Sequence, residues 1–358
     1  MPSTGADEPL HTATRKRVLL PGPTSPVAEA ILHREAELIR ASELDAAEVQ
    51  RLLPEVEGIY VQAPFVLTSE WIHAARRVEV IGTAGSGTNR IDVDAASACG
   101  IPVVHAAGAA YRSVAEHALG LMISLSKRIA YYDRYFHTHK EYPPPSTDAY
   151  GHQLHGKTVG IVGLGFIGRD VAHKCGIGFG MRVLAFDPYF AVSEARRQGI
   201  ELLRSIDDMI PDCDFVVITC PLNDETRDLI REHQLRRMKP SSYMIVSSRG
   251  GIVNEEDLVT ALQNEWIAGA GVDTWDPEPA PPNHPFYDME NTVLTRHIGG
   301  GTVEDLELIA RAVATQVLEA LRGIRPDHIA NPKVWPIGGQ SRRATAAAAD
   351  ASQATQTV

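Results

Sequence analysis

A glycine-rich segment over residues 159–168, Val-Gly-Ile-Val-Gly-Leu-Gly-Phe-Ile-Gly, constrains the fold more than any other feature of the chain. Gly163, Gly165 and Gly168 follow a short apolar run in the spacing G-x-G-x-x-G. In a parallel α/β sheet, the first glycine permits a tight turn, the second lets a ligand approach the backbone, and the third lets the next helix pack on the strand. The segment therefore predicts a strand, a turn, and a helix over 166–175 whose N-terminus faces a pyrophosphate.

An acidic residue at the end of the next candidate strand, 182–186, narrows the cofactor. Asp187 follows Gly168 by 187 − 168 = 19 residues, and a carboxylate about 20 residues after the motif binds the adenosine ribose hydroxyls. The same charge repels a 2′-phosphate, so the sequence predicts NAD rather than NADP. A glycine motif alone also occurs in plain turns, but here a strand, a helix and an acid accompany it.

Composition narrows the class of protein. A chain of 358 residues is longer than one ordinary core supports, which predicts two domains. The formal net charge of −11 argues against a nucleic-acid partner, because phosphate binding needs clustered Lys and Arg. The four cysteines lack C-x-x-C spacing, which favours buried free thiols and predicts no metal site.

The sequence also bears on location. The first eight residues contain no apolar h-region, and the apolar run 118–125 is too short to span a bilayer. We therefore expect a cytoplasmic protein with no membrane partner. Residues 1–15 and 337–358 are rich in Ala, Thr, Ser and Gln without periodicity, which predicts disordered tails.

Between these tails, short apolar runs alternate with helical patterns, which predicts a doubly wound α/β architecture. The candidate strands are 17–20, 58–62, 78–82, 103–105, 158–162, 182–186, 215–219, 243–246, 268–272 and 292–294.

Two long helices are predicted where the chain passes between the domains. Residues 113–116 form a capping box before apolar positions 118, 121, 122, 125 and 129, and residues 302–305 repeat this device. Since the second helix follows the last strand of the nucleotide domain, it returns the chain to the first domain. The expected divisions are a discontinuous substrate domain over 1–125 and 300–336, a nucleotide-binding domain over 126–299 entered by a loop over 137–156, and a tail over 337–358.

Three ionisable residues follow the candidate strands 243–246, 268–272 and 292–294, at the sheet edge where open α/β sheets bind ligands. Arg249 lies in Ser-Ser-Arg-Gly-Gly and is suited to hold a carboxylate with two hydrogen bonds. Glu278 lies in a proline-flanked turn, and His297 precedes a glycine-rich loop. Each alone has a structural explanation, such as a local ion pair or solvation. Their joint occurrence beside a dinucleotide motif indicates catalysis.

With these motifs the chain resembles the D-isomer-specific 2-hydroxyacid dehydrogenase family, which includes phosphoglycerate dehydrogenases and glyoxylate/hydroxypyruvate reductases. The resemblance covers about 78–325. The matching segments, in addition to the glycine motif with Asp187, are 82–92, Ser-Val-Ala-Glu-His over 113–117, Cys-Pro-Leu-Asn-Asp-Glu-Thr over 220–226, 238–251, 273–279, and His-Ile-Gly-Gly from 297.

The resemblance implies a flavodoxin-like substrate domain and a Rossmann NAD-binding domain, with the active site in the cleft between them. Arg249 would bind the carboxylate and carbonyl of a small 2-oxoacid or 2-hydroxyacid. His297 would act as general acid/base at the C2 oxygen while a hydride passes between C2 and the nicotinamide. Glu278 would orient His297 and favour its protonated form.

Further roles come from the resemblance alone. Backbone N–H groups of Ala84, Gly85, Ser86 and Gly87 would complete the carboxylate site, and Asp273 would contact the nicotinamide carboxamide. A homodimer is expected, because family members commonly dimerise through the nucleotide domain. The cofactor-binding residues implied in this way are Gly163, Gly165, Phe166, Ile167, Gly168, Asp187, Cys220, Pro221, Thr226, Ser248, Asp273, His297 and Gly299.

Two departures leave the substrate open. Arg296 stands where the family usually has proline, and Arg112 lies in a segment that usually carries an asparagine. Either could serve a second acidic group on the substrate, or Arg296 could pair with a surface acid such as Glu304. No regulatory domain is expected after residue 336.

Two other functions occur on the same fold. A corepressor of the C-terminal-binding type uses NAD to assemble with partners, and a phosphite dehydrogenase needs a basic residue where this chain has Thr83. The leading prediction is an NAD-dependent D-2-hydroxyacid dehydrogenase.

Overall fold

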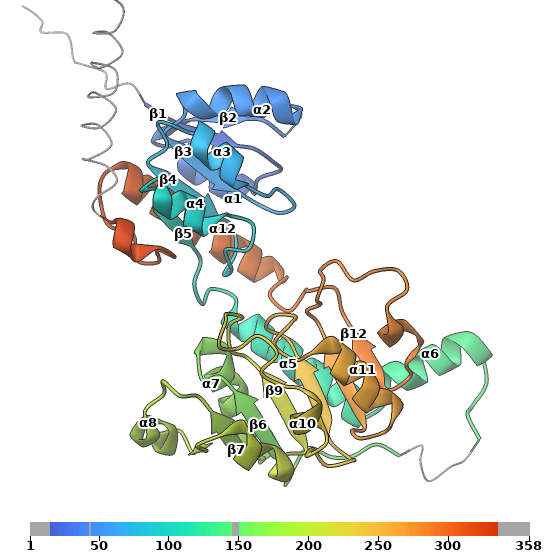
Figure 1. Ribbon diagram of the computed structural model, residues 1–358. Coiled ribbons are helices and arrows are strands. Elements are labelled where there is room, and N and C mark those ends of the chain that lie inside the picture. Colours follow the sequence, from blue (N-terminus) through green and yellow to red (C-terminus); the bar gives the residue numbers. More distant parts are fainter. Residues whose placement is uncertain (1–14, 43, 145–149, 336–358) are drawn as a thin grey trace, which may run out of the picture. The chain divides into compact units, whose positions relative to one another are not determined.

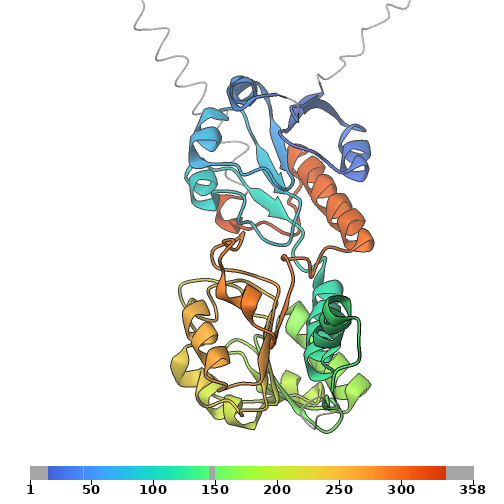
Figure 2. The ribbon, with the colours of Figure 1, turned by 90° about the vertical axis from the view of Figure 1, so that its right-hand side faces the viewer.

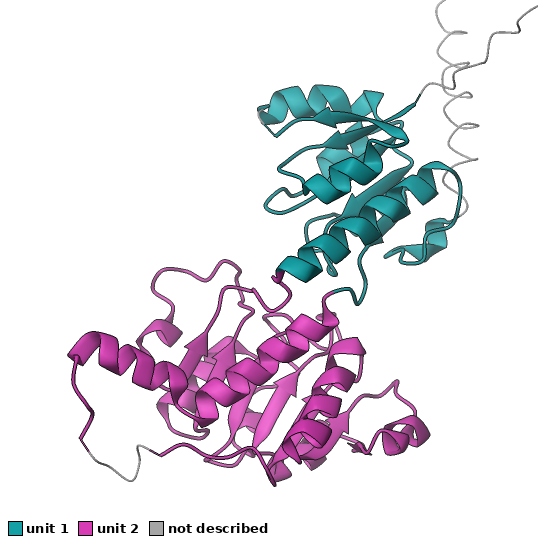
Figure 3. Cartoon of the chain, turned by 180° about the vertical axis from the view of Figure 1, so that it is seen from behind, with its two compact units in different colours: residues 1–109, 303–358 teal, residues 110–302 magenta. Residues whose placement is uncertain are grey.

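The computed structural model describes residues 15–42, 44–144 and 150–335, and the chain divides into two compact units (Figures 1 and 3). Unit 1 comprises residues 1–109 and 303–358, and unit 2 comprises residues 110–302. Unit 1 is therefore assembled from two separate stretches of chain. The tails predicted over 1–15 and 337–358 lie outside the described residues, except for Arg15.

Unit 1 contains a parallel sheet of five strands within its described residues, in the order β2-β1-β3-β4-β5. This is the order of flavodoxin-like folds, so the predicted class of this unit is confirmed. The strands are β1 (Lys16–Leu20), β2 (Ala36–Arg40), β3 (Gly58–Val61), β4 (Val80–Thr83) and β5 (Val103–His105).

Helices cover both faces of the unit 1 sheet and bury a separate apolar cluster on each side. Helices α1 (Pro26–Leu32) and α12 (Val303–Leu321) pack on one face, and Figure 2 shows α12, in orange-red, along the strands. The opposite face is covered by α2 (Ala46–Leu52), α3 (Ser69–Ala74) and α4 (Val93–Ala98).

Unit 2 contains a parallel sheet of seven strands among its described residues, in the order β12-β11-β10-β9-β6-β7-β8. Counted within the unit, this order is 3-2-1-4-5-6 extended by one strand, which is the Rossmann order. The strands are β6 (Thr158–Val162), β7 (Arg182–Phe186), β8 (Glu201–Leu202), β9 (Phe215–Ile218), β10 (Tyr243–Val246), β11 (Gly269–Val272) and β12 (Thr292–Leu294).

The unit 2 sheet is likewise covered on both faces. One face carries α5 (Tyr111–Ser126), α7 (Phe166–His173) and α8 (Val192–Arg197). The other carries α9 (Ile206–Met209), α10 (Glu232–Leu235) and α11 (Glu255–Gln263). Helix α6 (Ile129–His139) follows α5 and has no buried residue.

Helix α5 belongs to unit 2, so the division falls before this helix and not near residue 125 as expected. Leu121 and Met122 of α5 join the same apolar cluster as Val159 of β6 and Ile245 of β10. Close approach is possible because β11 carries Gly271, where a Cβ atom would lie 2.9 Å from the Leu121 Cβ.

Local details of the two connections also differ from expectation. Helix α5 begins at Tyr111 with Ala110 as its N-cap, so Ser113 lies inside the helix and is not its cap. The Ser113 hydroxyl lies 3.3 Å from the Thr302 hydroxyl instead. Position 129 does not extend the apolar face of α5, since Ile129 is 53% exposed at the start of α6. The loop expected over 137–156 begins as the end of that helix.

Candidate active site

The glycine motif forms the turn between β6 and α7. Gly163 has a φ of 98°, and a Cβ atom there would lie 2.7 Å from the Cys220 backbone nitrogen. A Cβ atom on Gly168 would lie 2.0 Å from the Gly163 carbonyl oxygen. These two glycines are therefore required by the packing of the turn itself. Around Gly165, by contrast, no atom lies within 4 Å of an added Cβ, so the backbone there is open to a ligand.

The N-terminus of α7 suits a phosphate. Gly165 is its N-cap residue and makes no side-chain capping hydrogen bond, so the first N–H groups of the helix have no side-chain acceptor at the cap. Together with the helix dipole, such groups bind anions. Phe166 is 55% exposed and Ile167 is half-buried beside this end. The residues present therefore fit a dinucleotide phosphate group, and the expected helix over 166–175 continues after His173 as a π-helical turn, Lys174–Gly178.

Asp187, which follows β7, already binds the glycine turn. Its two carboxylate oxygens accept hydrogen bonds from the backbone nitrogens of Leu164, at 2.7 Å, and Tyr189, at 2.9 Å. The carboxylate is half-buried. It thus shapes the turn in addition to any contact with a ribose, which stays a prediction.

The segment after β9 packs directly on the glycine turn. The Thr219 hydroxyl donates to the Gly163 carbonyl at 2.7 Å, and burial raises the pKa of the adjacent Cys220 thiol to about 11. The Thr226 hydroxyl donates to the Pro221 carbonyl at 2.6 Å and closes the loop. Cys220 is therefore a neutral, buried thiol, and the loop can offer a cofactor its backbone.

Arg249 follows β10 and is half-buried at the same edge of the sheet. Its Nη1 donates to the Ser248 carbonyl at 2.6 Å. Burial lowers the pKa of the guanidinium, and the nearby Glu278 charge partly opposes this shift. The hydroxyls of Ser247 and Ser248 are buried and have no hydrogen-bond partner among the described residues. An anion would compensate the guanidinium charge, and a polar ligand could satisfy the two hydroxyls.

Glu278 and His297 form a pair, although they are separated in sequence by a strand. His297 Nδ1 lies 2.8 Å from both Oε1 and Oε2 of Glu278. A carboxylate only accepts hydrogen bonds, so Nδ1 carries the proton and Nε2 is the nitrogen that can exchange a proton with a ligand. His297 has a left-handed backbone, with φ of 58°, which a histidine adopts only when its surroundings hold it there.

Asp273, which follows β11, holds the backbone of the His297 loop. The Asp273 carboxylate is 1% exposed and accepts from the backbone nitrogens of Ile298, at 2.8 Å, and Gly299, at 2.9 Å. The Asp273 carbonyl accepts from the His297 nitrogen at 2.6 Å. Burial alone would raise the pKa of this carboxyl, but its hydrogen bonds, first that with His117 and then that with Thr295, hold the pKa well below its usual range. Asp273 is therefore a charged anchor of the loop, and its nicotinamide contact stays a prediction.

The predicted carboxylate loop lies in unit 1, after β4. The Ala84 and Gly85 nitrogens already donate to the Val61 and Thr83 carbonyls, at 2.7 and 2.8 Å. Of the four predicted donors, only those of Ser86 and Gly87 have no acceptor in the part of the chain that the structure describes. If this loop binds a substrate carboxylate as predicted, the N–H groups of Ser86 and Gly87 are the two that remain to donate to it.

The two unusual arginines differ in their surroundings. Arg112 Nε donates to the Tyr111 hydroxyl at 2.9 Å, and its guanidinium lies 5.4 Å from the centre of that ring. Arg296 is exposed and makes no ion pair with another described residue of unit 2. Glu304, considered above as its partner, belongs to unit 1, so that pairing stays a hypothesis.

Two residues of the site were not identified from sequence. His117 Nε2 lies 2.9 Å from the Thr295 Oγ1, and Thr295 Oγ1 donates to Asp273 Oδ1 at 2.6 Å. The only signal for His117 was its place in the segment Ser-Val-Ala-Glu-His, to which no role was assigned. Among the residues described, no cluster of three or more His, Cys, Asp or Glu side chains could hold a metal ion.

The strand order, the glycine turn and the carboxylate after β7 define a dinucleotide-binding Rossmann unit. Residues 119–299 match the family described as D-isomer specific 2-hydroxyacid dehydrogenase, NAD binding domain. The chain belongs to the D-isomer specific 2-hydroxyacid dehydrogenase family. The predicted nicotinamide dinucleotide cofactor is thereby confirmed, and the preference for NAD over NADP stays a prediction.

Relatives of known name agree with this assignment. The D-3-phosphoglycerate dehydrogenase of Mycobacterium leprae is 35% identical over 279 residues, which cover 78% of this chain and 52% of that protein. The glyoxylate reductase of Thermofilum pendens is also 35% identical over 279 residues, covering 76% of this chain and 80% of that protein. The chain spans little more than half the length of the phosphoglycerate dehydrogenases that it matches.

A solved structure is similar over most of the chain. The NADPH-dependent glyoxylate/hydroxypyruvate reductase from Sinorhizobium meliloti, in complex with NADP and malonate, matches with a TM-score of 0.76 and 25% identity, covering 88% of this chain and 97% of that chain. These relatives do not favour the corepressor and phosphite alternatives. None of the helices in the described ranges is long and apolar enough to cross a membrane.

Proposed function

We propose that this protein is an NAD-dependent dehydrogenase that interconverts a small 2-oxoacid and the corresponding D-2-hydroxyacid. The observation that carries the proposal is the His297–Glu278 pair at the ligand edge of a Rossmann unit, with Nδ1 within 2.8 Å of both carboxylate oxygens. This arrangement fixes the tautomer of a general acid/base. When bound, the nicotinamide supplies or accepts the hydride.

Three residues of the chain bind the substrate and transfer the proton. The Arg249 guanidinium holds the substrate carboxylate, because its planar fork matches two carboxylate oxygens. His297 Nε2 gives a proton to the C2 oxygen during reduction and takes it back during oxidation. Glu278 holds the ring through Nδ1 and stabilises the positive charge when His297 is protonated.

The substrate class is a small 2-oxoacid of the glyoxylate, hydroxypyruvate or phosphohydroxypyruvate type. The names of two relatives, a glyoxylate reductase and a phosphoglycerate dehydrogenase, support this range. Because Arg296 is exposed without an ion pair to another described residue of unit 2, it is the arginine better placed to serve a second acidic group. We propose that it does so.

The test is oxidation of NADH by the purified full chain with glyoxylate, hydroxypyruvate, phosphohydroxypyruvate and 2-oxoglutarate. His297→Asn should reduce kcat by about 10²- to 10⁴-fold, the usual contribution of a general acid/base, and leave NADH affinity unchanged. Arg249→Lys should also impair turnover, because an ammonium cannot form the same fork. Arg296→Pro should lower kcat/KM for the doubly charged substrates only.

Tight NADH binding without turnover of any 2-oxoacid by the wild type would contradict the proposal and favour a corepressor. Near-normal kcat in His297→Asn would show that another group transfers the proton.

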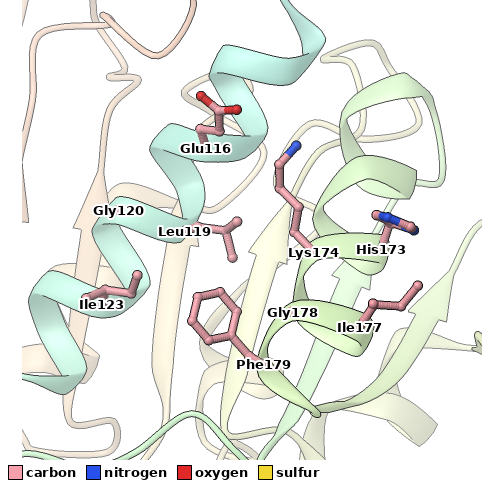
Figure 4. Close-up of a pocket in the computed structure, with 9 residues that line it drawn as sticks. All are labelled: Glu116, Leu119, Gly120, Ile123, His173, Lys174, Ile177, Gly178 and Phe179. Atoms are coloured by element: carbon pink, nitrogen blue, oxygen red, sulfur yellow. The ribbon is translucent and has the colours of Figure 1, made fainter.

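We further propose a homodimer formed through unit 2. An apolar groove of about 490 Å³ runs beside α5, away from the glycine turn. In Figure 4, Leu119 of α5 and Phe179, just beyond the π-helical turn, both point into this groove. Its lining includes Ile177, which is 77% exposed. Exposed apolar surface of this kind is typical of subunit interfaces.

The oligomeric state can be measured by sedimentation velocity. Wild type should sediment as a dimer and Ile177→Glu should shift it toward monomer, because the new charge would be buried without a partner. A monomeric wild type would contradict the proposal. The expected cytoplasmic location, which we also propose, can be tested by cell fractionation.

A further inference from the structure

His117 is the residue of the Ser-Val-Ala-Glu-His segment whose contacts reach the catalytic loop. It lies in α5, a helix whose other buried residues pack on the sheet. The His117 side chain is 21% exposed, and its Nε2 lies 2.9 Å from Thr295 Oγ1 and 3.4 Å from Asp273 Oδ1. None of the roles proposed above uses this imidazole.

The direction of the hydrogen bonds follows from the groups themselves. Thr295 has a single hydroxyl proton, and it is donated to Asp273 Oδ1 at 2.6 Å. The Thr295 oxygen must therefore accept the bond from His117, so His117 Nε2 carries a proton. The result is a directed chain from His117 through Thr295 to the Asp273 carboxylate.

This chain of hydrogen bonds leads to the backbone around His297. Asp273 binds the N–H groups of Ile298 and Gly299 through its carboxylate and that of His297 through its carbonyl. These bonds hold the left-handed backbone of His297, at φ 58°, which the residue does not favour on its own. If the carboxylate turned, the loop would lose the acceptors of two consecutive N–H groups.

The imidazole is also packed against the loop. A Cβ atom placed on Gly299 would lie 3.1 Å from Asp273 Oδ2 and 3.5 Å from the His117 Cδ2. The ring therefore occupies the space beside the carboxylate, and its removal would leave both a missing donor and a cavity.

We infer that His117 is a positioning residue for the general acid/base: its Nε2–H, acting through Thr295, fixes the Asp273 carboxylate and thereby the loop that presents His297. The inference rests on the proposed function for its catalytic consequence, but its structural content can be measured without turnover.

The kinetic test compares two variants of the full chain. His117→Leu removes the donor and should lower kcat by about tenfold or more, as loss of a partner behind a functional side chain commonly does, with KM for the 2-oxoacid and Kd for NADH unchanged. His117→Gln keeps an N–H donor at a similar reach and should restore most of kcat. The matched control is His233→Leu, the same substitution at an exposed histidine of α10, whose Nε2 lies 3.5 Å from Asp207 Oδ1; it should not affect kcat.

A double-mutant cycle tests the path. Thr295→Val should reproduce the loss of kcat, and the His117→Leu/Thr295→Val double variant should be no slower than the worse single variant, because both break one chain of bonds. Additive losses would overturn the path.

The second readout is amide hydrogen exchange of the protein without cofactor. Ile298 and Gly299 should exchange faster in His117→Leu and remain protected in His117→Gln and His233→Leu. If the wild type turns over no 2-oxoacid, the proposed function fails and this exchange still decides the positioning role. Wild-type kcat and unchanged protection in His117→Leu, or a Gln variant no better than the Leu variant in both measurements, would overturn the inference.

Discussion

Two carboxylates of unit 2 serve the backbone as well as a ligand. Asp187 accepts hydrogen bonds from the nitrogens of Leu164 and Tyr189, and Asp273 accepts from those of Ile298 and Gly299. In both cases one residue sets the shape of a loop and the charge that a cofactor meets. Substitutions at these positions change both properties, so a test must separate charge from geometry.

For Asp187, the separation comes from two variants. Asp187→Asn keeps an oxygen that can accept from Leu164 but removes the charge. The preference for NADH over NADPH should therefore narrow by about fivefold or more. This factor corresponds to about 1 kcal/mol, the repulsion between two like charges 4 Å apart in water. Asp187→Ser removes the charge and the reach, so it should narrow the preference and also weaken binding of both cofactors. Fluorescence titration measures the six dissociation constants, for NADH and NADPH with the wild type and each variant.

The prediction for Asp187 has a clear counter-result. A wild type that binds NADH and NADPH equally, or an unchanged ratio in both variants, would show that this carboxylate does not select the cofactor.

Asp273 predicts a dependence of stability on pH. Its pKa is depressed in the folded chain, so its contribution to stability is present above the unfolded value of about 3.9 and is lost as the pH falls through the folded value. Asp273→Asn replaces one of the two accepting oxygens with an NH₂ group, which cannot accept the backbone N–H bond made there, and it should reduce the free energy of unfolding at neutral pH by about 1–3 kcal/mol. Urea titrations without cofactor should show the difference between the two proteins shrinking in acid. A constant difference would contradict the assigned charge.

At the level of elements, the glycine turn contains both structural and functional glycines. Gly168→Ala places a Cβ atom 2.0 Å from the Gly163 oxygen and should lower the free energy of unfolding by about 2 kcal/mol, within the usual range for overpacking. Gly165→Ala meets no atom within 4 Å, so it should leave stability unchanged and weaken NADH binding. Thermal unfolding and NADH titration of both variants check this contrast, and equal destabilisation would refute it.

Elements buried on both faces were the easiest to predict from sequence. Strands β6, β9 and β10 are short continuous apolar runs, as expected for parallel strands under helices. Strand β2, Ala-Glu-Leu-Ile-Arg at the sheet edge, has an exposed glutamate and arginine, and β8 has only two residues. Neither carries a pattern strong enough to stand out, so both were missed.

The site was predictable only in part for a related reason. Arg249, Glu278 and His297 could be identified because each follows a strand and belongs to a family motif. The partner of Asp273 could not, because His117 precedes it by 273 − 117 = 156 residues and their contact depends on how α5 packs on the sheet. The hydrogen bond from the Ala84 nitrogen depends in the same way on a neighbouring strand, because its acceptor is the Val61 carbonyl of β3.

At the scale of the whole molecule, each unit has apolar clusters of its own. One cluster of unit 2 draws on residues from Val162 to Leu294 and the other on residues from Ala115 to Val293, all within the continuous stretch 110–302. The clusters of unit 1 draw on the N-terminal stretch and on α12 and the residues after it. One continuous stretch of sequence therefore supplies the whole apolar core of unit 2, whereas the core of unit 1 needs two separate stretches.

This difference predicts how fragments behave. Residues 110–302 expressed alone should unfold cooperatively and bind NADH, since the glycine turn, Asp187 and both apolar clusters are retained, but should not turn over a 2-oxoacid. Residues 1–109 alone should not fold, because Val313 and Val317 of α12 cover the β4 strand, where a Cβ on Gly82 would lie 2.9 and 2.6 Å from them. Joining residues 303–335 to this fragment through a flexible linker should restore a cooperative transition, which circular dichroism detects. A cooperative transition in 1–109 without α12 would show that unit 1 does not need its second stretch, and a 110–302 fragment that neither unfolds cooperatively nor binds NADH would show that unit 2 does not fold on its own.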